Sequence, residues 1–234
     1  MGFLQFRATD LRVCLFGILI FVFSGTFSAF AQPPNLGELK TQLLSYKLYG
    51  EYDRELAAVD TQAQAFIDAQ ASLWPKPAIV LDIDETSLSN WQEISADDFG
   101  YISAGSCTDL PKGPCGALAW DQLAQATAIE PTLALFNYAK AKGIAVFFIT
   151  GRFEAERCAT ERNLQNAGYS GWAELIMRQT GKSSSVTDYK SGEREKIEQR
   201  GYTIIANIGD QPSDLNGGHS KGAFLLPNPF YRIP

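Results

Sequence analysis

Three short apolar runs constrain the fold of this chain more than any other feature of its sequence. Each run is continuous rather than alternating, which predicts a strand buried on both faces. The runs are Ala78–Leu81, Ile144–Ile149 and Thr203–Ile208. Segments with helical spacing separate them, and strands that alternate with helices form a mostly parallel sheet with helices on both faces. We therefore expect an α/β fold.

The remaining segments complete one domain over residues 32–234. Two further short strands are expected at Glu174–Met177 and Ala223–Leu226. Helical spacing is found in Leu36–Leu48, Tyr52–Trp74, Pro131–Lys142, Glu154–Asn166 and Gly192–Arg200. The first two of these helices form an N-terminal helical extension over residues 32–76. Between about residues 91 and 127 the periodicity fades and aromatic residues mix with acidic ones, which predicts an inserted cap.

Polar side chains follow each of the three runs. Asp82 and Asp84 follow the first, Thr150 follows the second, and Asp210 and Asp214 follow the third. Parallel strands place their carboxyl ends at one edge of the sheet, where ligands bind in open α/β folds. Taken singly, each residue has an ordinary explanation as a turn former or helix cap. Their convergence at one edge favours a functional site.

The two first carboxylates are two residues apart. If the strand persists that far, Asp82 and Asp84 point to one spot, because side chains alternate along a strand. Two acids beside an apolar run need a cation between them. Lys190, just before the charged helix Gly192–Arg200, is a candidate for part of that charge.

The N-terminal 31 residues have the pattern of a secretory signal peptide. Arg7 and Arg12 give a weakly basic start, Val13–Phe23 is an almost unbroken apolar core, and a small-x-small pattern ends at Ala31. Cleavage there would leave Gln32 first and release a secreted or periplasmic protein with no later membrane span. The alternative is an uncleaved N-terminal anchor.

Export makes disulfides possible. Cys107 and Cys115 bracket a turn-rich segment and are predicted to pair, which would contribute ~2.5 kcal/mol by closing a short loop. Cys158 falls in a helical pattern and is expected to be a buried free thiol. With a single His, His219, a zinc site is improbable. The formal net charge of −6 does not favour binding of nucleic-acid polymers.

Four motifs resemble, in order, those of the haloacid dehalogenase (HAD) superfamily. They are DIDET at residues 82–86, ITGR at 149–152, Lys190, and GDQPSD at 209–214. More narrowly, the chain from Pro77 to the C-terminus is similar to the secreted acid phosphatases of that superfamily, both plant vegetative-storage-type and bacterial class C. The resemblance implies a Rossmann-like three-layer αβα sandwich with a small inserted cap.

The resemblance also implies catalytic roles. Asp82 would be the nucleophile that forms an aspartyl-phosphate, and Asp84 the general acid and then the general base. Asp84 must be protonated for the first step; a neighbouring carboxylate raises its pKa and a nearby metal lowers it. Thr150, Gly151 and Lys190 would hold phosphoryl oxygens, with Lys190 neutralising charge that grows during transfer.

Mg²⁺ suits a site built from oxygen ligands, water and phosphate. The resemblance implies Asp82, the backbone carbonyl of Asp84, and Asp210 as ligands. Asp214 would be either a further ligand or a residue that orients the neighbouring groups. Gly209, like the glycine of the second motif, would let the backbone approach the ligand closely.

Substrate choice is less constrained. Trp91, Phe99 and Tyr101 in the cap, and Tyr231 in the tail, could stack on a nucleobase or aryl group or could fill the cap. Arg152 is a weaker candidate for the phosphate pocket. The resemblance as a whole implies a Mg²⁺-dependent phosphomonoester hydrolase acting on a small phosphomonoester. The alternatives are a non-catalytic storage or binding protein on the same fold, and a phosphotransferase that passes the phosphate to an acceptor alcohol.

Overall fold

The computed structural model describes residues 1–2, 32–181 and 184–233. The chain divides into two compact units, Met1–Pro34 and Asn35–Pro234, and all described helices and strands belong to the second. The predicted signal peptide lies almost wholly on residues 3–31, outside the described residues. In the described part of the chain, no helix combines the length and apolar character needed to cross a membrane.

A five-stranded sheet forms the centre of the second unit. Its strands, in spatial order, are β5 (Glu174–Arg178), β4 (Ala145–Phe153), β1 (Pro77–Leu81), β6 (Thr203–Gly209) and β7 (Gly222–Leu225). Every pairing is parallel, and the three predicted apolar runs form the three middle strands. The predicted α/β fold with a mostly parallel sheet is therefore confirmed.

The sheet is buried on both faces, as the continuous apolar runs predict. Ile79 and Leu81 of β1 pack in the larger core, with the helices α2 (Glu51–Gln70) and α5 (Glu130–Ala141). Ala78 and Val80 point to the other face, in a smaller core that includes Ile197 of α7 (Val186–Gln199). Burying each of these larger aliphatic side chains stabilises the fold by about 1.5–3 kcal/mol.

Two helices precede the sheet, as predicted. Asn35 caps α1 (Leu36–Leu48), because its side-chain oxygen accepts hydrogen bonds from the N–H groups of the first turn. The next helix, α2, starts after Gly50, which has a left-handed backbone (φ 73°) that suits glycine. A single 3₁₀ turn, η1 (Ala71–Leu73), follows α2 before the chain enters β1.

The predicted start of one helix is wrong. The charged helix was expected at Gly192, but α7 begins at Val186, so that Lys190 lies within the helix and is buried. The reason is a cap: the Ser185 hydroxyl accepts a hydrogen bond from the Asp188 N–H. Three further elements belong to this half of the chain: η2 (Glu154–Glu156), α6 (Arg157–Asn166) and α8 (Pro212–Leu215).

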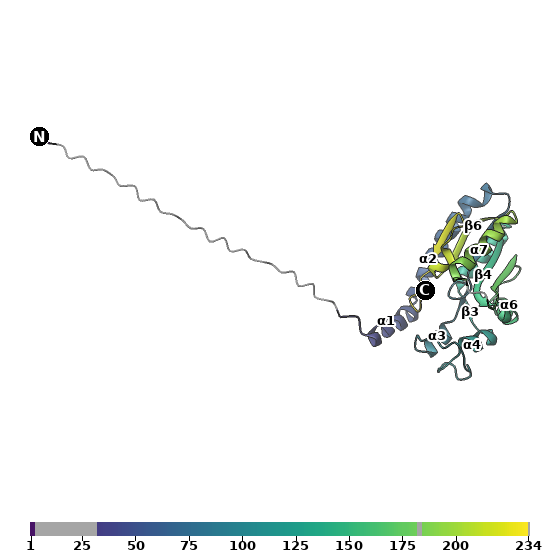
Figure 1. Cartoon of the computed structure of the whole chain (residues 1–234), viewed down its shortest axis with the longest axis horizontal. Coiled ribbons are helices and arrows are strands. Elements are labelled where there is room, and N and C mark those ends of the chain that lie inside the picture. Colours follow the sequence, from purple (N-terminus) through teal and green to yellow (C-terminus); the bar gives the residue numbers. More distant parts are fainter. Residues whose placement is uncertain (3–31, 182–183, 234) are drawn as a thin grey trace. The chain divides into compact units, whose positions relative to one another are not determined.

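The cap is inserted between two short strands. β2 (Leu88–Ser89) pairs antiparallel with β3 (Thr127–Ala128), which brings the ends of the insertion together. Its helices α3 (Trp91–Ala96) and α4 (Ala117–Leu123) lie together at one end of the sheet, at the bottom of Figure 1. The predicted disulfide between Cys107 and Cys115 is present in the cap.

Cys158 is exposed, so its predicted burial is wrong. The helix α6 turns Ala159, Thr160, Asn163 and Leu164 inward. Because an α-helix repeats every 3.6 residues, Cys158 falls on the opposite, outer side.

Candidate active site

The carboxyl end of β1 leads directly into a buried cluster of charges. The Asp82 N–H donates to the Ile208 carbonyl (3.0 Å), which fixes Asp82 at the sheet edge. Lys190 belongs to helix α7, and its ammonium group lies 2.5 Å from Asp82 Oδ1 and 2.6 Å from Asp214 Oδ1. All three side chains are buried. The structure therefore brings together three of the predicted site residues from distant parts of the chain.

One ammonium group is shared by two carboxylates. Burial alone would lower the pKa of Lys190, but Asp82 and Asp214 outweigh it and raise the pKa above its ordinary value. Burial raises the pKa of Asp82, Lys190 opposes that rise, and the neighbouring acids Asp214 and Asp210 add to it. The cluster has more negative than positive charge, which favours binding of a further cation.

Asp210 is the third carboxylate of this cluster. Its Oδ2 accepts hydrogen bonds from Gln211 and from Asn228 of the C-terminal tail, both at 2.7 Å. Its Oδ1 accepts a longer one from Thr86 (3.2 Å). These contacts from three segments hold the carboxylate in one orientation at the end of β6.

The donor set fits a hard divalent cation. Carboxylate oxygens of Asp82, Asp210 and Asp214 lie within 4.8 Å of one another. Both oxygens of Asp214 are already engaged, one by Lys190 and the other by the Gln211 N–H (2.9 Å). Asp82 Oδ2 accepts no hydrogen bond from the described residues, and Asp210 Oδ1 accepts only the longer one from Thr86, so these two carboxylates are the better ligands. An all-oxygen set is what Mg²⁺ prefers.

Gly209 is required for a reason other than the one expected. Close approach of the backbone to a ligand was predicted, but a Cβ at this position would lie 2.5 Å from the Asp214 Cβ. Gly209 therefore makes room for Asp214 at the start of α8. At Gly151, by contrast, a Cβ would meet no atom within 4 Å, and this residue does line the cleft.

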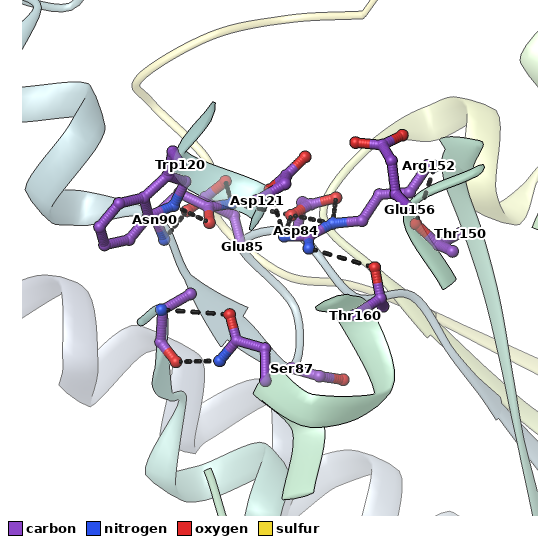
Figure 2. A network of polar contacts seen from close by, with 12 residues as sticks. Asp84, Glu85, Ser87, Asn90, Trp120, Asp121, Thr150, Arg152, Glu156 and Thr160 are labelled. Atoms are coloured by element: carbon purple, nitrogen blue, oxygen red, sulfur yellow. Dashed lines mark hydrogen bonds and ion pairs between the residues drawn. The ribbon is translucent and has the colours of Figure 1, made fainter. Parts of the chain in front are cut away.

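Asp84 is paired with a different cation from Asp82. β1 ends at Leu81, and the Arg152 guanidinium contacts the Asp84 carboxylate through Nε (3.1 Å) and Nη2 (2.5 Å). Figure 2 shows the Arg152 side chain reaching Asp84. The strand does not persist to Asp84, and among the described residues the Asp84 carboxylate pairs with Arg152 while the Asp82 carboxylate pairs with Lys190.

Arg152 is itself held by several groups. Its Nη2 lies 2.9 Å from Asp121 of the cap helix α4, and its Nη1 lies 3.5 Å from the Thr160 hydroxyl. Burial raises the pKa of Asp84, but Arg152 and a hydrogen bond from Asn90 bring it below its ordinary value. Asp84 is thus held as a carboxylate by the protein itself, with no metal needed for that shift.

A second chain of contacts joins the tail, the turn after β1 and the cap. The Tyr231 hydroxyl donates to Glu85 Oε2 (2.7 Å), and Glu85 Oε1 accepts from the Asn90 N–H (2.7 Å). The Trp120 indole N–H donates to Asn90 Oδ1 (2.8 Å), as Figure 2 shows. Asn90 also contacts Asp84, so the tail and the cap both help to position that carboxylate.

These groups line a cleft of about 550 Å³ between the sheet edge, the cap and the tail. Its floor carries Asp82, Asp84, Lys190 and Asp210. Its walls are largely apolar or aromatic and include Ile94, Phe99, Tyr101, Leu118, Trp120 and Phe230. A mostly apolar cleft with a few convergent polar groups is typical of a small-molecule site.

Comparison with known proteins identifies the family. The sequence profile of HAD superfamily, subfamily IIIB (acid phosphatase) matches residues 28–234. The chain belongs to this acid phosphatase subfamily. This confirms the predicted membership of the HAD superfamily and of its acid phosphatase branch.

Curated relatives of this family member include plant proteins. The chain is 33% identical over 190 residues to the stem 28 kDa glycoprotein of Glycine max, covering 80% of this chain and 72% of that one. It is 36% identical over 156 residues to acid phosphatase 1 of Solanum lycopersicum. That match covers 66% of this chain and 58% of the tomato protein, less than two thirds of its length.

A solved structure with a similar fold is the class C acid phosphatase from Bacillus anthracis. The TM-score is 0.67 at 22% identity, and the match covers 84% of this chain and 86% of that one. This likeness confirms the predicted HAD-type fold.

Some predicted residues of this family member do not face the cleft. Thr150 is fully buried at the floor, where its hydroxyl accepts a hydrogen bond from the Arg152 N–H (3.1 Å). Trp91 packs against Phe99 and Phe230 and is not among the described residues that line the cleft. Phe99, Tyr101 and Tyr231 do line it, as expected.

Sequence reasoning missed several residues at the cleft. Arg152 is the last residue of the second motif and the main partner of Asp84, although the sequence favours it only as a weaker candidate for the phosphate pocket. Asn90, Glu93 and Asp121 were not selected, because isolated polar residues in a region without periodicity carry no local signal. Only the fold of the cap brings them to the site.

Proposed function

We propose that this chain is a Mg²⁺-dependent phosphomonoester hydrolase that acts through an aspartyl-phosphate on Asp82. The single observation that supports it best is the buried cluster of Asp82, Lys190 and Asp210 at the sheet edge, open to the cleft. Membership of the acid phosphatase subfamily supports the same conclusion.

In the first step, a carboxylate oxygen of Asp82 attacks phosphorus. The bond from phosphorus to the ester oxygen breaks, and the leaving oxygen keeps the electron pair and takes a proton from Asp84. Asp84 first takes that proton from solvent; because Arg152 lowers the pKa of Asp84, the protonated form needed here is favoured at acidic pH. Lys190 stays beside Asp82 and offsets negative charge on the phosphoryl oxygens. Gly151, near the end of β4, lines the cleft and would let its backbone come close to the phosphoryl group.

In the second step, water attacks the phosphorus of the aspartyl-phosphate. Asp84 accepts a proton from that water, the bond from phosphorus to Asp82 breaks, and phosphate is released. Arg152, Asn90 and the cap hold Asp84 in place for both steps.

Asp82, Asp210 and the backbone carbonyl of Asp84 would hold the metal ion, and none of the described backbone N–H groups donates to that carbonyl. A bound Mg²⁺ supplies charge that neutralises the phosphate and orients it toward the nucleophile. Asp214 contributes by orienting Lys190.

Hydrolysis of a generic aryl phosphate by the mature protein tests the proposal. Activity should require Mg²⁺, stop when a chelator is added, and fall by several orders of magnitude in Asp82→Asn. Asp109→Asn, which changes an exposed acid of the cap, is the matched control. Normal turnover by Asp82→Asn would overturn the mechanism, and no turnover by the intact protein would favour the storage alternative.

Measuring which molecule receives the phosphate, water or an added alcohol, distinguishes hydrolysis from phosphotransfer. The two reactions differ only in the second nucleophile, so adding an acceptor alcohol and measuring the ratio of alcohol released to free phosphate distinguishes them. We propose hydrolysis as the main reaction, with a ratio close to one.

We also propose that the chain is exported after cleavage at Ala31. The Cys107–Cys115 disulfide supports this, because disulfides persist in oxidising compartments. The mass of the protein recovered from the producing organism would show Gln32 as its first residue if the proposal holds.

A further inference from the structure

One buried carboxylate in the cleft has no partner. Glu93, on the cap helix α3, is only 7% exposed and lines the cleft. Among the described residues, no donor forms a hydrogen bond or ion pair with its carboxylate. Asp82 and Asp84, in contrast, each contact a cation. The Glu93 oxygens are not among the fully enclosed polar atoms without a partner, so they open onto the cleft, where a ligand can supply the donor that the described residues do not.

The wall around Glu93 is rich in carboxyl groups. Asp121 and Glu156 also line this side of the cleft, and Glu156 Oε1 is buried without a hydrogen-bond partner. Arg152 is the cation beside Asp121, and it is shared with Asp84. Figure 2 shows Asp121 and Glu156 near Arg152. We define the acidic wall as Glu93, Asp121 and Glu156.

Aromatic rings stand beside the acidic wall. Phe99, Tyr101 and Trp120 line the same cleft, and Tyr101 is 80% exposed. Burial raises the pKa of the Tyr101 hydroxyl, and the carboxyl groups of Asp121, Glu93 and Glu156 raise it further. Aromatic faces beside carboxylates are a favourable environment for an organic cation.

The cleft therefore offers cationic side chains for a phosphate at its floor and carboxyl groups on the side of the cap. Lys190 on the floor, with Arg178 at the end of β5, suits the phosphate group. The acidic wall lies on the cap side, where the alcohol part of the substrate would extend. A substrate with a negative phosphate and a positive alcohol part matches both ends at once.

We propose that the cleft prefers phosphomonoesters whose alcohol part is positively charged, such as an alkylammonium, with Glu93 as the residue that binds the cation. This inference rests on the proposed phosphatase function and names the substrate class. Glu93 determines specificity and does not take part in the phosphoryl transfer itself.

Three aryl phosphates of similar shape test the inference. They are O-phosphotyramine with an ammonium group, 4-ethylphenyl phosphate without charge, and 3-(4-phosphonooxyphenyl)propanoate with a carboxylate. We expect kcat/KM to be highest for the ammonium ester, on the order of tenfold above the neutral one, and lowest for the carboxylate. The reacting phosphate is the same in all three, so their ratios report the alcohol part.

The variant Glu93→Gln keeps the shape of the side chain and removes its charge. The preference for the ammonium ester over the neutral one should fall several-fold in this variant. Glu195→Gln, which removes an exposed charge on the outer side of α7, should keep the full preference.

The pH dependence of the preference gives a further readout. Burial, Asp97 and Asp84 raise the pKa of Glu93 to about 7, so its negative charge increases as the pH rises from 6 to 8. The preference should rise over that range and become flatter in Glu93→Gln. Asp121, Tyr101 and Arg152 also border this part of the cleft, and Asp121 titrates with a pKa raised by burial to about 8, so the difference between the two proteins isolates Glu93.

The outcomes distinguish the two proposals. Turnover of all three esters without a charge preference overturns the inference and leaves the phosphatase function intact. A full preference in Glu93→Gln overturns the assignment to Glu93. Failure to hydrolyse any of the three esters overturns the proposed function, and the inference with it.

Discussion

Buried carboxylates on the floor of the cleft and on its cap wall differ in whether they have a cationic partner. On the floor, Asp82 and Asp214 share Lys190 at 2.5 and 2.6 Å. On the wall, Glu93 is as deeply buried but has no cation among the described residues. The difference separates two regions: on the floor the protein itself supplies a cation for the carboxylates, whereas on the wall the described residues supply none for Glu93.

A third buried carboxylate, outside the cleft, completes the comparison. Asp60 of α2 is 4% exposed, and its Oδ2 accepts one hydrogen bond from Thr132 of α5 (3.0 Å). Its Oδ1 is buried without a partner. Asp60 faces no cleft, so its charge is a cost to stability that no ligand offsets.

Removing Lys190, the cation on the floor of the cleft, should have the largest effect on activity and stability. Lys190→Met leaves Asp82 and Asp214 buried without their shared partner. We expect kcat on an aryl phosphate to fall by on the order of 10²–10³, and the free energy of unfolding to fall by about 3–5 kcal/mol. Steady-state kinetics and denaturant unfolding measure the two effects.

The matched control lies on the same helix. Lys196 forms an exposed ion pair with Glu193 (2.7 Å), and Lys196→Met should change stability by less than about 1 kcal/mol. An unchanged kcat in Lys190→Met would contradict the role given to the floor cluster.

Weakening the second cation should have an intermediate effect. Arg152→Lys keeps the positive charge but loses the two-point contact with Asp84, because an ammonium group lacks the planar fork of a guanidinium. We expect kcat to fall about 10- to 100-fold with a smaller change in KM. Arg162→Lys, at an exposed arginine of α6, is the control and should retain activity. Equal kcat values for Arg152→Lys and wild type would show that this contact does not position Asp84.

The smallest effect should come from the carboxylate outside the cleft. Burial raises the folded-state pKa of Asp60 from 3.8 to about 6. Between about pH 4 and 6, Asp60 is protonated in the folded state and ionised in the unfolded state. The contribution of Asp60 to stability is therefore lost as the pH rises over this range. Asp60→Asn should remove this loss and stabilise the protein at pH 7 by about 2–3 kcal/mol.

Thermal unfolding at pH 4 and pH 7 measures this change. The difference in Tm between Asp60→Asn and wild type should be larger at pH 7. Asp53→Asn, at an exposed acid of the same helix, should lack this trend. A gain in stability that is equal at both pH values would show that the Asp60 charge is not its source.

The sequence alone determined the sheet and the edge at which the site forms. Continuous apolar runs are buried on both faces, and the helical segments between them require parallel connections. The residues after Leu81, Ile149 and Ile208 therefore had to meet at one edge. The cap was also predictable in outline, because a long segment without periodicity, held by a Cys107–Cys115 pair, is not part of a sheet.

Only the tertiary structure decided which charge pairs with which. Arg152 reaches Asp84 across 68 positions of sequence, and Lys190 reaches Asp82 across 108. Such pairs depend on where a strand ends and on the orientation of helices packed from another layer, and local periodicity encodes neither. The burial of Glu93 without a partner likewise depends on how the cap folds over the sheet, since no short-range pattern separates it from an exposed glutamate.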